Sequence, residues 1–206
     1  MTLFDLFLIL LVLGTAAGLV TAIVAAALRR WTFAGRLVLS LVLAWAAYLA
    51  IGAVVALKTP QHIVALGEDR CFDEMCYAVM GYNRTPSENV GHSWYIVSVR
   101  ISNRSRGRAQ RELGRKGVLI DRVGRTYEVS GEGMQALTPV GAPPFPGLDT
   151  EVGPGQSLRT SLVFDLPTNV DYPGFALESN LAINPARVVI GDEEHFLHWP
   201  TVVTLD

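Results

Sequence analysis

Two long apolar segments without a charged residue constrain the fold of this chain more than any other feature. No charge occurs from Leu6 to Leu28 or from Leu37 to Leu57. Each segment matches the roughly 20 residues that a helix needs to cross the hydrocarbon core of a bilayer. Buried helices of soluble domains rarely lack a polar face over such a length. The sequence therefore predicts a transmembrane hairpin in residues 1–57, with helices at about 5–28 and 37–57.

A cleaved signal peptide is the alternative interpretation of the first segment. Signal peptides begin with positive charge, continue with a shorter apolar core and end at a small-residue cleavage site. Here the first residues include Asp5 and no Lys or Arg, and the arginines follow the apolar segment. This order favours a retained helix.

The connector at residues 29–36 predicts the orientation of the hairpin. Arg29, Arg30 and Arg36 lie close to both membrane ends, whereas Lys58 is the only basic residue at the opposite flank. Short loops rich in Lys and Arg stay in the cytoplasm. We therefore expect a protein of the cell membrane that crosses it twice, with both termini extracytoplasmic.

Small residues recur at four-residue spacing along the first helix, at Gly14, Gly18 and Ala22. Because lipid tails give helices no hydrophobic reason to associate, close backbone approach through small residues supplies the packing. This face is predicted to pack either within the hairpin or against another membrane protein or a second copy of this chain.

Beyond a linker at 58–70, residues 71–206 read as an extracytoplasmic all-β domain. Hydrophobic residues alternate with polar ones, and Gly- and Pro-rich segments separate the alternating runs. Several short strands with turn signals between them indicate a β-sandwich. The predicted strands lie within "YIVSVRIS" (95–102), "VLIDRVGRTYEV" (118–129, turning at Gly124), "SLRTSLVFDL" (157–166) and "ARVVIGDEEHFLHWPTVV" (186–203, turning at Gly191 to Glu194).

The order of these strands resembles a bacterial, membrane-anchored, immunoglobulin-like domain family sometimes called telokinin-like. The matching pattern is a hydrophobic strand ending in Asn, an Asp-x-x-Gly-x-x-Tyr hairpin, and a Pro-Gly turn before a strand that ends in Phe-x-x-Pro. The resemblance implies an immunoglobulin-like sandwich and supplies no catalytic residues; a two-helix anchor departs from the usual single anchor. The matching residues are Asn103, Asp121, Gly124, Tyr127, Pro154, Gly155, Phe164 and Pro167.

Cys71 and Cys76 are the only cysteines. Because the predicted compartment is oxidising, a disulfide between them is favoured over a buried thiol at Cys76 and an exposed one at Cys71.

A basic segment between two predicted strands is the main compositional anomaly. Nine basic and two acidic residues lie between Arg100 and Arg125, while residues 58–206 carry fourteen basic and eighteen acidic residues, a net charge of −4. The segment is either a solvated loop or a contact surface for phospholipid headgroups, an envelope polymer or an acidic partner. Nucleic acid is excluded by the compartment and by the lack of interleaved aromatic residues. The candidate interaction residues are Arg104, Arg106, Arg108, Arg111, Arg115 and Lys116.

The remaining motifs are weaker indications of a functional site. His195 and His198 would point to opposite faces of a strand, which disfavours a shared metal ion. "GEGMQA" at 131–136 has the glycine spacing of a dinucleotide site, but the prolines after it leave no room for a helix of useful length. A Pro-rich loop at Ala142 to Leu148 offers a second contact surface.

The sequence therefore predicts a non-enzymatic interaction module, an accessory or structural subunit of a membrane protein complex, without a cofactor. One alternative is a metal-dependent or hydrolytic envelope enzyme using His195, His198 and Glu194. The other is a surface spacer or stress-protective protein without a specific partner.

Overall fold

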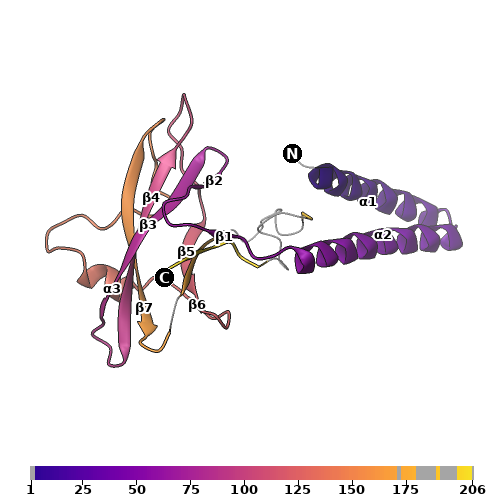
Figure 1. The fold of residues 1–206 in the computed structure, drawn as a ribbon. Coiled ribbons are helices and arrows are strands. Elements are labelled where there is room, and N and C mark those ends of the chain that lie inside the picture. Colours follow the sequence, from indigo (N-terminus) through magenta and orange to yellow (C-terminus); the bar gives the residue numbers. More distant parts are fainter. Residues whose placement is uncertain (1–2, 171–172, 180–188, 191–198, 206) are drawn as a thin grey trace. The chain divides into compact units, whose positions relative to one another are not determined.

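The computed structural model describes residues 3–170, 173–179, 189–190 and 199–205. The chain divides into two units, which we describe separately. One comprises Met1–Pro60 with Ile183–Trp199, and the other Gln61–Ala182 with Pro200–Asp206. The first unit contains a helical hairpin and the second contains two β-sheets (Figure 1).

Two long helices form the hairpin. Helix α1 is Leu3–Ala27, with 25 residues, and α2 is Trp31–Lys58, with 28 residues. At 1.5 Å per residue these helices are about 37 and about 42 Å long. Helix α2 begins at Trp31 rather than near Leu37, because Arg36 interrupts the charge-free run but, as a good helix former, does not interrupt the helix. The connector is thus shorter than expected, and Arg29 turns the chain with a φ of 57°.

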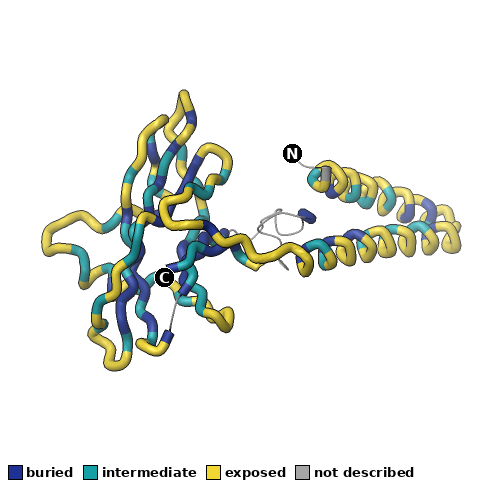
Figure 2. The backbone as a smooth tube through the Cα atoms, in the orientation of Figure 1, coloured by how far each residue is buried: buried dark blue, intermediate teal, exposed yellow. Residues whose placement is uncertain are grey.

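The two helices pack along one narrow seam. The less exposed residues of α1 recur in alternating steps of three and four, the spacing of a coiled-coil seam. The buried residues of α2 include Ala34, Tyr48, Gly52 and Ala56. Most of the remaining hairpin surface is exposed and apolar (Figure 2). The seam residues of α1 are Leu8, Leu11, Thr15, Gly18, Ala22 and Ala25.

The second unit is a β-sandwich of two sheets. One sheet has the strand order β1-β9-β8-β5-β6 and the other β2-β3-β4-β7. β1 and β9 are parallel, whereas the other pairs are antiparallel. The strands are β1 (Ile63–Val64), β2 (Arg70–Phe72), β3 (Met75–Pro86), β4 (His92–Asn103), β5 (Arg115–Ile120), β6 (Thr126–Tyr127), β7 (Ser157–Pro167), β8 (Gly174–Ser179) and β9 (Val202–Thr204).

One hydrophobic core lies between the sheets. The predicted alternation in β4 is confirmed, because Val97, Val99 and Ile101 are fully buried. Phe164 of β7 meets Phe175 of β8 edge to face, with ring centroids 6.3 Å apart. A bridge between Val129 and Phe164 links the chain after β6 to the opposite sheet. These contacts join both sheets around the same core.

Several local predictions differ from the structure. The segment predicted as a linker contributes β1, which pairs with β9. "GEGMQA" does form a helix, α3 (Gly131–Ala136), because Ser130 caps it by accepting a hydrogen bond from the Gly133 amide; it ends before Pro139. The predicted closing hairpin is wrong at Val189 and Ile190, which are not in a strand and pack against Leu8 and Tyr48 of the helices. Its turn at Gly191 to Glu194 lies outside the described residues.

Candidate interaction surface

Most of the exposed large apolar side chains in the described chain lie on the helical hairpin. Both helices are long and apolar enough to cross a membrane, with mean hydropathies of 2.6 and 2.3. Large side chains such as Leu13, Ile23 and Leu43 are 61%, 68% and 60% exposed. By its position, α1 meets the criteria for a signal sequence equally well.

Two residues of the predicted small-residue face lie in the seam between the helices, and the third is exposed. Gly18 faces the other helix, since a Cβ there would lie 3.0 Å from a methyl group of Leu41, and Ala22 is buried. Gly14 is exposed, with no atom within 4 Å of a Cβ at its position. Trp45 reinforces the seam by donating a hydrogen bond from Nε1 to the Thr15 hydroxyl, 2.9 Å away.

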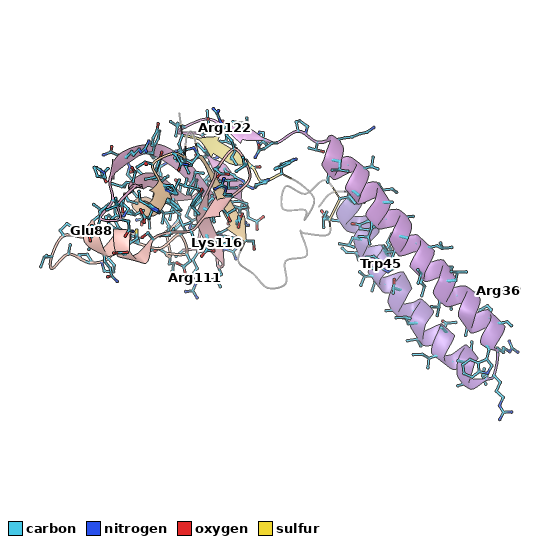
Figure 3. The ribbon with its side chains drawn as sticks, turned by 90° about the horizontal axis from the view of Figure 1, so that it is seen from below. Arg36, Trp45, Glu88, Arg111, Lys116 and Arg122 are labelled. Atoms are coloured by element: carbon cyan, nitrogen blue, oxygen red, sulfur yellow. A yellow bond between two sulfur atoms is a disulfide. The ribbon has the colours of Figure 1, made fainter. Side chains whose placement is uncertain are left out.

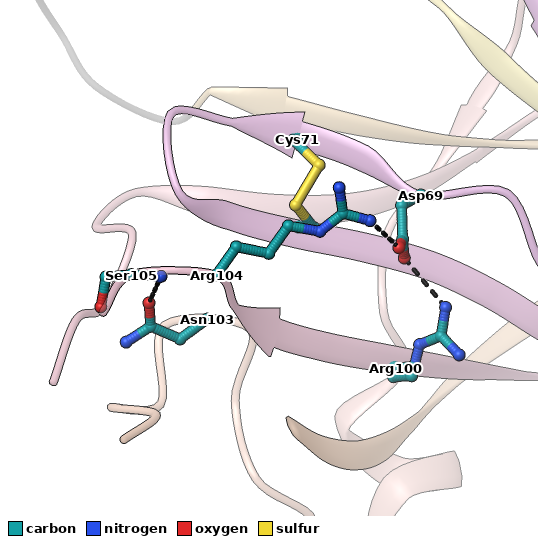
Figure 4. The surroundings of a disulfide bond; sticks show 7 residues. Asp69, Cys71, Arg100, Asn103, Arg104 and Ser105 are labelled. Carbon is teal, nitrogen blue, oxygen red and sulfur yellow. Dashed lines mark hydrogen bonds and ion pairs between the residues drawn. A yellow bond between two sulfur atoms is a disulfide. The ribbon is translucent and has the colours of Figure 1, made fainter. Parts of the chain in front are cut away.

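Cys71 and Cys76 form a disulfide, as predicted. They lie directly opposite each other in the antiparallel pair β2 and β3. The bond therefore fixes the short strand β2 to the edge of the four-stranded sheet (Figure 4).

Asp69, immediately before β2, binds two arginines beside this disulfide. It accepts hydrogen bonds from Arg100, at 3.0 Å, and from Arg104 (Figure 4). Burial opposes ionisation of Asp69, but the hydrogen bonds and positive charges of the two guanidinium groups outweigh it, so the pKa of Asp69 lies below its ordinary value. Arg104 is thus partly neutralised and holds the start of the basic loop against the segment after β1.

The basic loop, residues 104–114, has an ordered backbone built around Asn103. The Asn103 side-chain amide donates to the carbonyl oxygens of Arg108 and Val152, and its oxygen accepts from the Ser105 amide. Backbone bonds between Gln110 and Val152, in both directions, hold the middle of the loop. The loop therefore presents its side chains from a fixed backbone.

Three predicted interaction residues, Arg106, Arg108 and Arg111, are exposed on this loop. Within the described parts of the chain, none of the three forms an ion pair. Leu113, which follows them, is 53% exposed. Among the described residues, the loop thus combines three guanidinium groups that have no carboxylate partner with one exposed apolar side chain.

Arg115 and Lys116 were expected in the same loop but belong to strand β5. The Arg115 side chain is 9% exposed, pairs with Glu112 at 3.3 Å and lies 3.6 Å from the centre of the Phe72 ring. Lys116 lies between Glu128, at 3.2 Å, and Glu178, at 3.7 Å. Both are therefore neutralised within the sandwich, whereas Arg111 has no ion pair among the described residues.

The predicted Pro-rich surface at Ala142 to Leu148 is anchored at one end. Leu148 is buried in the core, and its carbonyl oxygen accepts a hydrogen bond from the Tyr77 hydroxyl. Burial, followed by the negative charge of Glu112, raises the pKa of Tyr77 to about 12. Pro143 and Pro144 remain exposed.

Sequence reasoning missed Asp69 and Phe72, which neutralise or cover the basic residues around the disulfide. Their partners are distant in the sequence, so no local pattern predicts the contacts. Among the described residues, no three His, Cys, Asp or Glu side chains form a metal-binding group. His195, His198 and Glu194 lie outside the described residues.

No family model matches the chain, and no curated protein matches it. The solved structures similar to it include an uncharacterized β-sandwich protein from Clostridium difficile 630, 12% identical, with a TM-score of 0.44 over 72% of this chain and 97% of that one. The secreted protein MPT63 from Mycobacterium tuberculosis is 11% identical, with a TM-score of 0.41 over 62% and 95%. The yjhA protein from Bacillus subtilis is 15% identical, with a TM-score of 0.41 over 71% and 100%.

Proposed function

We propose that this chain is a membrane-anchored, extracytoplasmic interaction module that serves as an accessory or structural subunit of a membrane protein complex. The observation that carries the proposal is the hairpin, whose helices bury one seam and leave most of their apolar surface exposed. In water such a surface is an aggregation hazard, whereas in a bilayer it meets lipid or another membrane helix.

We further propose that both helices are retained and that the sandwich is extracytoplasmic. Arg29, Arg30 and Arg36 gather at the bend, the arrangement expected for a cytoplasmic end. The seam between α1 and α2 gives α1 a packing role that a cleaved signal sequence does not need. A disulfide in the sandwich suits an oxidising compartment.

The immunoglobulin-like, telokinin-like assignment also belongs to this proposal. Asp121 accepts hydrogen bonds from the amides of Val123 and Arg125 and from the Tyr127 hydroxyl. Gly124 has a φ of +82°, which favours glycine. The Asp-x-x-Gly-x-x-Tyr pattern therefore has a structural role in a hairpin turn, as the resemblance implies.

Extraction of the full chain in a mild detergent tests the subunit role. We expect a membrane protein to co-purify in a fixed ratio, and we expect Gly14→Leu, on the exposed helix face, to reduce its recovery. A chain that elutes alone as a stable monomer would contradict the subunit role.

The intact mass of the extracted chain tests whether α1 is retained. We expect the mass of the whole sequence, and a product that lacks α1 would overturn the hairpin. A reporter fused after Asp206 tests orientation, because only an extracytoplasmic carboxyl terminus would make a periplasm-dependent reporter active.

A further inference from the structure

We propose that the basic loop binds the anionic phospholipid headgroups of the bilayer that holds the hairpin, through Arg106, Arg108 and Arg111 with Leu113 at the apolar boundary. This inference rests on the proposed membrane anchorage. The proposed ligand of the loop is the phosphodiester group of these headgroups.

The short stretch of chain between α2 and β1, which we call the tether, restricts the distance between the sandwich and the bilayer. Helix α2 ends at Lys58 and β1 begins at Ile63. Even fully extended, that stretch spans only about 17 Å. Asp69, a few residues after β1, is ion-paired with Arg104 at the base of the loop. The start of the loop is therefore fixed to the segment between β1 and β2.

The three arginines differ from the other basic residues around them. Arg104, Arg115 and Lys116 already have carboxylate partners. Arg106, Arg108 and Arg111 are exposed and have no such partner in the described chain. A guanidinium group binds two oxygens of a phosphate at once, so these side chains have the chemistry for headgroups.

Charge distribution also favours the bilayer as the ligand. Residues 58–206 have a net charge of −4, so an anionic membrane repels the rest of this region. Turning the basic loop toward the membrane replaces that repulsion by attraction. Leu113, 53% exposed, can enter the interfacial layer once the arginines bind phosphate.

The test uses the full chain in nanodiscs of phosphatidylcholine alone or with about one third phosphatidylglycerol. A fluorophore is attached through Ala109→Cys, since Ala109 is exposed in the loop and the native cysteines are bonded to each other. Quenchers attached to the lipid headgroups report contact between the labelled loop and the membrane surface. We expect strong quenching only with the anionic lipid, and a loss of quenching when salt rises from about 0.1 to about 0.5 M.

Two double variants, each of which removes two positive charges, identify the charges responsible. Arg106→Gln with Arg108→Gln is expected to lower the ratio of contacting to free loop by about 25-fold, from roughly fivefold for each charge near an anionic surface. Arg122→Gln with Arg125→Gln removes the same charge from the β5–β6 turn, which lies away from Arg111 (Figure 3), and should leave quenching unchanged. Circular dichroism checks that all variants fold.

Equal quenching in both lipids, quenching in neither, or no effect of Arg106→Gln with Arg108→Gln would overturn the proposal. Protection of the loop only in the presence of a co-purified protein would also overturn it, because the arginines would then recognise an acidic protein surface. That last result would leave the subunit role intact. Conversely, a chain without a protein partner whose loop still binds anionic lipid would contradict the subunit role alone.

Discussion

The hairpin and the sandwich use apolar side chains in opposite ways. In the hairpin, Ile23 is 68% exposed and the helices pack only along one narrow seam. In the sandwich, Val97 and Phe164 are fully buried between two sheets. This contrast is what the proposed membrane anchorage predicts, because an exposed apolar surface suits hydrocarbon, whereas a buried apolar core suits water.

Removing one large side chain from each unit should produce the largest contrast. Phe164→Ala leaves a cavity between the sheets and is expected to lower the free energy of unfolding of the sandwich by about 3–5 kcal/mol. Leu43→Ala in α2, where the side chain is 60% exposed, should change the stability of the hairpin little in detergent. Denaturant titration in micelles, followed by near-ultraviolet circular dichroism for the sandwich and helical signal for the hairpin, measures both. Equal losses of stability in the two units would contradict the interpretation that the hairpin side chains face hydrocarbon while those of the sandwich are buried from water.

The sequence predicted the elements that bury only one face. β4 alternates, and the helices appear as uncharged runs, so both were visible as local patterns. Strand β8 was missed because it has no alternation: Phe175 faces the core, while Ala176 is buried on the other face with Val118 and Val202. A strand covered on both faces lacks the period-two signal.

The basic loop was predicted from composition alone, but the pairing state of each residue was not. Arg104 is neutralised by Asp69, and Arg115 lies over Phe72. These contacts depend on how β2 packs beside β3 and on where β5 begins. Composition therefore located the surface, and the tertiary fold decided which three arginines remain available.

Substitutions at two glycines of α1 sharpen the description of the hairpin seam. Gly18→Leu forces a side chain against Leu41 and is expected to destabilise the hairpin by about 1–3 kcal/mol. Gly14→Leu introduces the same group where no atom lies within 4 Å, and it should leave the hairpin intact. Thermal loss of helical signal in detergent compares the two. A larger effect at Gly14 would mean that the helices pack through a different face.

The smallest expected effect concerns the hydroxyl of Tyr77 in the sandwich. Tyr77→Phe removes the hydrogen bond to the Leu148 carbonyl oxygen and should lower the free energy of unfolding by about 1 kcal/mol at neutral pH. The tyrosine loses its proton near pH 10 in the unfolded chain, but at about 12 in the folded sandwich. Between these values the folded chain holds more protons, so raising the pH lowers stability, and the contribution present below pH 10 is lost. Tyr77→Phe should therefore flatten the decline in stability between about pH 10 and 12. Urea titrations at stepped pH measure that slope, and an unchanged slope would show that burial of this hydroxyl does not control alkaline unfolding.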